Sequence, residues 1–257
     1  MDPAFLPDGI SLLAAGILVL ASFFTSALTA AFGLGGGLAM LALLGLFIPV
    51  SALIPVHGLV QLGSNTGRAF NQRAHVRQSI LGPFALGTVL GAAAGAAIVV
   101  QLPDAPLKLT LGLFIIALTW AKIPGFDRLG KAGLAAGALV LAFLSMFLGA
   151  TGPLAQAFFG QLISDDRKAL IATHAAAMTL QHGLKVGAFM LAGFAFADWI
   201  VLVAAMIASG YLGTMTGTVL LERIDEASFR KWFRIGLTLL GLDLARRGLA
   251  GLVWPSF

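Results

Sequence analysis

The chain has 257 residues, of which 59% are hydrophobic and 11% are charged, and its formal net charge is +5. Its mean hydropathy of +0.96 excludes an ordinary soluble domain and favours an α-helical integral membrane protein. The chain contains no cysteine, which excludes disulfides, thiolate metal sites and cysteine nucleophiles. We expect no nucleic-acid partner, because basic residues of this number suit the cytoplasmic loops of a membrane protein.

The apolar residues form ten segments of helical length. We expect these segments at roughly 10–32, 38–48, 51–72, 80–100, 106–122, 132–149, 153–163, 167–192, 196–221 and 229–251. The pattern predicts an all-α integral membrane protein in which residues 1–257 form one transport domain. A short linker at 123–131 joins two halves of five segments each, 10–122 and 132–251.

Two of the segments, 38–48 and 153–163, are too short to cross a bilayer alone. Each has about 11 residues, or roughly 16 Å of helix, which is half the hydrocarbon thickness. Each follows a glycine-rich break, Gly33–Gly37 in the first half and Gly149–Pro153 in the second. We expect each short segment to share a crossing with the end of the preceding one. The break then exposes a helix N-terminus that favours an anion, although close helix packing also explains the glycines.

The breaks and the segments that follow them repeat after about 117 positions, as expected for an internally duplicated transporter. If every segment crosses the membrane, five crossings per half require the second copy to be inverted relative to the first. Most Lys and Arg residues then fall in loops on one side when the N-terminus is outside. We therefore expect a multi-pass protein of the cytoplasmic membrane with both termini outside.

A polar stripe runs along the segment that follows each break. At 100° per residue the members of each stripe share one helix face, and they are His57, Gln61, Asn65 and Arg68 in the first copy and His174, Gln181, His182 and Lys185 in the second. Such a face inside a membrane must meet other helices or water, so interhelical hydrogen bonds are one explanation. No acidic residue lies deep in a segment, and an unpaired cation there favours an anionic ligand.

The helix–glycine breaks at Phe24–Gly37 and Phe143–Pro153, together with the aromatic-acid turn Gly193–Trp199, resemble the sulfite exporter TauE/SafE family of membrane transporters. The resemblance covers essentially the whole chain. The second break departs from the family pattern, because Ala150 and Thr151 stand where another glycine-rich run is common. The resemblance implies export of sulfite or of sulfur-containing organic anions such as sulfonates.

These features together predict a secondary transporter for a small oxyanion, with the lipid bilayer as its surroundings, and not an enzyme. The site is expected to combine backbone N–H groups at the breaks with the two polar stripes: Gly35, Gly36, Gly37, His57, Gln61, Asn65, Arg68, Thr151, Gly152, His174, Gln181, His182 and Lys185. We expect no cofactor and no metal. Proton coupling through the histidines is a hypothesis, and the oligomeric state stays open. The alternatives are a potential-driven anion channel and, with less support, an intramembrane hydrolase using Ser209.

Overall fold

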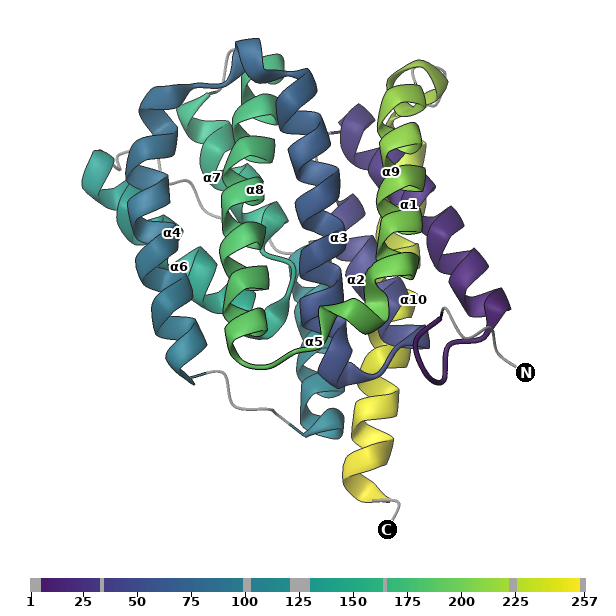
Figure 1. The fold of residues 1–257 in the computed structure, drawn as a ribbon. Coiled ribbons are helices and arrows are strands. Elements are labelled where there is room, and N and C mark those ends of the chain that lie inside the picture. The colour runs from purple at the N-terminus through teal and green to yellow at the C-terminus, as the bar shows by residue number, and fades with distance from the viewer. Residues whose placement is uncertain are drawn as a thin grey trace.

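The protein is seen in a computed structural model that describes residues 6–32, 35–98, 103–120, 130–163, 166–221 and 226–254. These residues form ten α-helices and two short 3₁₀-helices, and no strand occurs among them. Figure 1 shows the helices α1 (Leu12–Phe32), α2 (Gly36–Phe47), α3 (Val50–Asn71), α4 (Gln78–Ile98), α5 (Asp104–Trp120), α6 (Lys131–Leu148), α7 (Gly152–Leu162), α8 (Arg167–Leu191), α9 (Ile200–Leu221) and α10 (Glu226–Val253).

The ten predicted segments are confirmed as the ten helices, with bounds that differ by only a few residues. The largest difference is at the start of α9, because Phe196–Trp199 form a separate 3₁₀ turn before Ile200. Most of the predicted linker, residues 123–129, lies outside the described residues. The apolar runs were sufficient to predict the bounds of the helices, because a glycine, a proline or a charged residue lies at the end of almost every run.

Within the described residues, three helical stretches are long and apolar enough to cross a membrane: Leu12–Ala31, Gln78–Ala97 and Phe196–Gly217. Shorter apolar helices cover Gly36–Phe47 and Ala132–Leu148. The polar stripes lower the hydropathy of α3 and α8, and Figure 1 shows these two helices at the centre of the bundle. An all-helical bundle with apolar outer helices and polar central ones is typical of a multi-pass membrane protein.

Glycines bring the outer helices into close contact in two pairs, α4 with α6 and α1 with α9. A Cβ at Gly87 would overlap the backbone of Ala135, and one at Gly91 would overlap the backbone of Leu139. The same relation joins Gly213 of α9 to Phe23 of α1. These glycines therefore serve close helix packing. Four residues farther along α4 the contact has also moved four residues farther along α6, so the two helices run parallel.

The central pair α3 and α8 runs antiparallel. Gly58 faces Lys185, and farther along α3 the Cβ position of Gly183 lies 3.7 Å from Leu62. At the far end of the pair the backbone N–H of Arg77 donates to the Thr173 hydroxyl at 2.9 Å. The pair α5 and α10 is antiparallel as well, because Gly248 packs on Leu109 whereas Trp120 Nε1 donates to the earlier residue Thr238 at 2.9 Å. Equivalent helices of the two halves thus pair head to tail.

The short helix α2 turns back along α1 and does not continue its crossing. A Cβ at Gly36 would overlap the carbonyl oxygen of Thr25 and the hydroxyl of Thr29, both in α1. In one continuous helix Thr25 and Gly36 would lie about 16 Å apart, so the chain reverses between them. The reversal uses Gly35 at φ +93°, a conformation that other residues rarely adopt.

The second short helix, α7, also folds back on the helix before it. The Cβ position of Gly137 in α6 lies 3.0 Å from the Phe158 ring in α7. The glycine-rich breaks are therefore where the sequence placed them, but the expectation that each short helix shares a crossing with its predecessor was wrong. Hydropathy cannot distinguish a reversal from a kink, because both leave the same two apolar runs.

The N-terminus of α8 is capped by Asp166, whose side chain accepts a hydrogen bond from Ala169 N at 2.9 Å. This bond, with a smaller contribution from Arg77, lowers the pKa of Asp166 below its ordinary 3.8. The stabilisation is thus complete above pH 3.8 and is lost as the pH falls through the lowered pKa. We expect Asp166→Ala to lower the melting temperature in detergent at pH 7, by an amount that shrinks as the pH falls below 3.8.

Asp166→Asn is the matched control for this cap, because the amide oxygen accepts the same bond without titrating. It should retain most of the wild-type melting temperature at pH 7. A melting temperature of Asp166→Ala equal to that of the wild type at pH 7 would show that the cap contributes nothing.

Candidate functional site

The first break places the N-terminus of α2 inside the bundle. Gly35 precedes the helix, and no side chain caps it. The N–H groups of Gly36, Gly37 and Leu38 have no acceptor within the helix, since the first helical bond is donated by Ala39 to the Gly35 carbonyl. Most of α2 is buried, so these donors and the positive end of the helix dipole act in surroundings of low polarity.

The second break starts α7 with a different residue set. Thr151 precedes the helix, but its hydroxyl accepts a hydrogen bond from Gln181 Nε2 at 2.7 Å and does not cap α7. Gly152 opens the helix, and Pro153 has no N–H group to offer. The α7 terminus therefore presents fewer backbone donors than α2.

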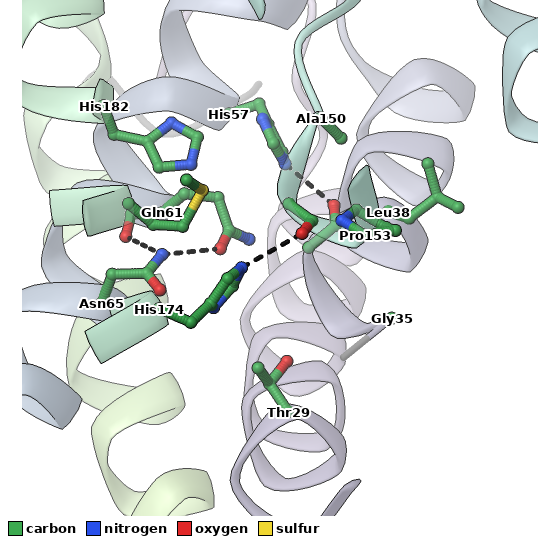
Figure 2. Close-up of a pocket in the computed structure, with 13 residues that line it drawn as sticks. Thr29, Gly35, Leu38, His57, Gln61, Asn65, Ala150, Pro153, His174 and His182 are labelled. Carbon is green, nitrogen blue, oxygen red and sulfur yellow. Dashed lines mark hydrogen bonds between the residues drawn. The ribbon is translucent and has the colours of Figure 1, made fainter. Parts of the chain in front are cut away.

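One histidine from each polar stripe contacts the half-helix of its own half. His57 Nε2 donates to the Gly37 carbonyl at 2.9 Å, and His174 Nε2 donates to the Gly152 carbonyl at 3.1 Å. A carbonyl can only accept, so each Nε2 carries the proton. The two contacts hold α3 against α2 and α8 against α7 at equivalent places, and both are drawn in Figure 2.

The two half-helices and the two stripes enclose one cavity of about 40 Å³, shown in Figure 2. Residues of both halves line it: Thr29, Gly35, Gly37, Leu38, His57, Gln61, Asn65, Ala150, Gly152, Pro153, His174, Met178 and His182. The rings of His57 and His182 meet edge to face across α3 and α8, with centroids 5.9 Å apart. The histidine-bearing faces therefore point toward each other.

Eight predicted site residues line this cavity: Gly35, Gly37, His57, Gln61, Asn65, Gly152, His174 and His182. The other five lie next to it. Gly36 faces α1, Thr151 and Gln181 bind each other, and the two cations, Arg68 and Lys185, contact protein groups.

Arg68 and Lys185 are among the most buried large side chains, with 2% and 1% of their surface exposed. Arg68 donates to Asn65 Oδ1 and to Ser64 Oγ, both at 3.2 Å. Lys185 Nζ donates to the Gly149 carbonyl at 2.6 Å. Among the described residues neither cation forms a salt bridge, since the ion pairs there involve Arg77, Lys108, Arg246 and Arg247.

The cavity is consequently electropositive. Two helix N-termini and two buried cations surround it, and none of the described residues that line it carries a carboxylate. A negative charge entering this space is attracted by the two cations and by the positive ends of the two helices. Asn65 connects the cavity to Arg68, because its amide donates to the Gln61 carbonyl at 2.8 Å while its oxygen accepts from Arg68.

Sequence reasoning did not single out five of the lining residues: Thr29, Leu38, Ala150, Pro153 and Met178. Leu38, Ala150 and Pro153 adjoin the glycines of the breaks, so their positions were a signal that could have been used. Thr29 enters because α2 folds back on α1, which the sequence did not predict. Met178 shares the inner face of α8 and has no polar atom to mark it.

Ser209, the nucleophile of the hydrolase alternative, lies away from the cavity. Ser209 Oγ donates to the Val19 carbonyl at 2.7 Å, in the contact between α1 and α9, and does not line the cavity. The described residues hold no group of three or more His, Asp or Glu side chains suited to a metal ion.

These features define a helical, multi-pass membrane protein with a buried electropositive cavity between its two halves. The model of the family described as Sulfite exporter TauE/SafE matches residues 18–244. The chain belongs to this family. The family is one of membrane transporters for sulfite and related sulfur-containing anions. No curated protein and no solved structure matches the chain.

Proposed function

We propose that the protein is a secondary transporter that exports sulfite or a small organosulfonate across the cytoplasmic membrane. One observation carries the proposal: both half-helix N-termini and both histidine-bearing faces meet at one cavity, and no carboxylate lines it in the described part of the chain. Backbone N–H groups of α2 and the Gly152 N–H suit the oxygens of an oxyanion. Gln61 and His182 are placed to donate further hydrogen bonds.

The size of the cavity favours the smaller of these substrates. At about 40 Å³ it has room for roughly three water-sized groups, and sulfite has three oxygens. A sulfonate with an organic substituent needs additional space, which requires the half-helices to separate. We therefore expect sulfite to bind more tightly than larger sulfonates in this conformation.

The proposed mechanism is alternating access between two inverted repeats, residues 10–122 and 132–251. The packing supports it, because α4 pairs with α6 as α9 pairs with α1, both in parallel, and equivalent helices pair head to tail. A two-fold axis in the membrane plane produces these relations. One repeat can then rock against the other around the shared cavity.

The proposed orientation places both termini outside. Figure 1 shows the two termini at the same end of the bundle. At the opposite end Arg77 contacts Asp166 at 3.7 Å, which brings the basic loops around Arg73 and Arg167 together. Such a face is typical of the cytoplasmic side. An inside-negative potential then favours anion export by about 2.3 kcal/mol per charge per 100 mV; proton coupling through the histidines remains a hypothesis.

Sulfite flux into proteoliposomes tests the proposal. A carrier should show saturable flux and counterflow, in which a high internal sulfite concentration accelerates uptake of labelled sulfite. Conductance without counterflow would show that the protein is an anion channel and not a carrier. Absence of sulfite and sulfonate flux under both conditions would contradict the proposed substrate class.

Gly152→Ala probes the cavity itself. The new Cβ would lie 3.8 Å from His174 Nε2, an ordinary contact, so the fold should tolerate it. The methyl group occupies cavity volume that the anion needs, and we expect flux to fall roughly tenfold. Gly160→Ala in the same helix is the control, because its Cβ meets nothing within 4 Å. Wild-type flux in Gly152→Ala would remove this cavity from the transport path.

A further inference from the structure

A second cavity, with a volume of about 610 Å³, lies at the end of the bundle that carries the termini. Its walls come from the starts of α3 and α5, the end of α6 and the turn after α8: Val50, Ser51, Ile54, Pro55, Pro103, Asp104, Leu107, Met146, Phe147, Phe189, Ala192, Gly193, Phe194 and Ala195. We call this space the vestibule. In the proposed orientation it faces the outside.

Only a thin layer of protein separates the vestibule from the central cavity. On α3, Ile54 lines the vestibule and His57 lines the central cavity, and the two residues are about 4.5 Å apart along the helix axis. In the second half Met146, near the end of α6, lines the vestibule, and Ala150, in the break, lines the central cavity. The turn at Gly149 therefore belongs to the layer between the two spaces.

The Gly149 turn is held by contacts from the other elements of this layer. Gly149 has φ +75°, and a Cβ there would lie 3.0 Å from Leu41 of α2 and 3.8 Å from Ile54 of α3. Its carbonyl accepts the 2.6 Å hydrogen bond from Lys185. This bond is the only charged contact that ties the turn to α8 among the described residues, and a charge-assisted bond is stronger than a neutral one.

Among the described residues, which do not include Gly33 and Leu34 of the first break, the equivalent cation Arg68 has different partners from Lys185. Lys185 reaches across to the break of its own half, whereas Arg68 binds Ser64 and Asn65 on its own helix. The Arg68 Nε atom is buried without a partner. The two cations, which occupy matching positions of the two stripes, thus differ in their described partners, and the bond to a break is seen only for Lys185.

We infer that the Gly149–Ala150 turn is the gate between the vestibule and the central cavity, and that Lys185 holds it closed. This inference rests on the proposed transport function. Lys185 is here a positioning residue that acts through the Gly149 carbonyl. An anion in the central cavity competes with that carbonyl for the ammonium group, since His182, one turn before Lys185, lines the cavity. Substrate binding then weakens the bond that keeps the gate closed.

Cysteine accessibility tests the gate, because the chain has no cysteine of its own. Met178→Cys places a thiol in the central cavity, and Ser51→Cys places one in the vestibule. Each is labelled with a membrane-impermeant thiol reagent, applied separately from each side of oriented vesicles. The Lys185→Met substitution should raise the labelling rate of Met178→Cys from the side of the termini roughly tenfold or more. It should leave the rate at Ser51→Cys unchanged.

The direction of the change separates gating from loss of structure. A destabilised protein labels faster from both sides, whereas an opened gate labels faster only from the side of the termini. Arg68→Met is the matched control and should not raise labelling from that side. Equal labelling with and without Lys185→Met would overturn the gate. Because labelling needs no substrate, this result is independent of the flux assay: lack of flux with a working gate would refute only the proposed anion.

Discussion

Replacing Arg68 with Met should reduce anion flux by more than tenfold while leaving the protein folded. Arg68 is buried next to Asn65, a cavity residue, and forms no salt bridge among the described residues. A fixed charge close to a bound anion contributes on the order of 2 kcal/mol at the effective dielectric of protein sites, which corresponds to roughly thirtyfold in binding. Removing a buried charge also removes its desolvation cost, which offsets the lost hydrogen bonds to Asn65 and Ser64, so the variant should still fold.

Arg73→Met is the control for this substitution. Arg73 is exposed just beyond α3, where it contacts the Phe70 ring at 4.7 Å and donates to the Phe70 carbonyl. Its charge is screened by solvent, so flux should stay near the wild-type value. Sulfite flux in proteoliposomes and melting temperature in detergent measure both variants. Undiminished flux in Arg68→Met would mean that this cation only stabilises the end of α3.

The helices could be predicted from the sequence because their signals are local. Each is a run of apolar residues of helical length, and both polar stripes follow from the 100° spacing. The convergence of His57 and His174 on one cavity also follows, once the repeat is read as inverted. These inferences need only sequence spacing and one symmetry.

The chain reversal at Gly35 and the hydrogen bond from Lys185 to the Gly149 carbonyl could not be predicted in the same way. The reversal depends on how α2 packs against Thr25 and Thr29, which is a tertiary contact. Lys185 was expected to contact substrate because it is a cation on the polar face. In the structure its ammonium reaches the Gly149 carbonyl, and only the fold of the second break brings that carbonyl within reach.

Gly36→Ala is expected to be strongly destabilising although it adds only one methyl group. The added Cβ would overlap the Thr25 carbonyl and the Thr29 hydroxyl, and the carbonyl belongs to the backbone of α1 and cannot rotate away. Overpacking of this kind costs about 3 kcal/mol or more when the backbone must move. Since α2 is largely buried, its displacement disrupts the core around Leu41 and Leu44. We expect a large fall in melting temperature and in the yield of folded protein.

Gly16→Ala in α1 separates this effect from a general response to alanine. Its Cβ meets nothing within 4 Å, so the helix should be stabilised by about 0.5–1 kcal/mol. If Gly36→Ala melts at the wild-type temperature and only flux is lost, Gly36 belongs to the anion site and not to the packing of α1 on α2. If both melting temperature and flux are retained, the close approach of the two helices is not required, and the position of the α2 N-terminus beside the cavity must depend on the His57–Gly37 hydrogen bond alone.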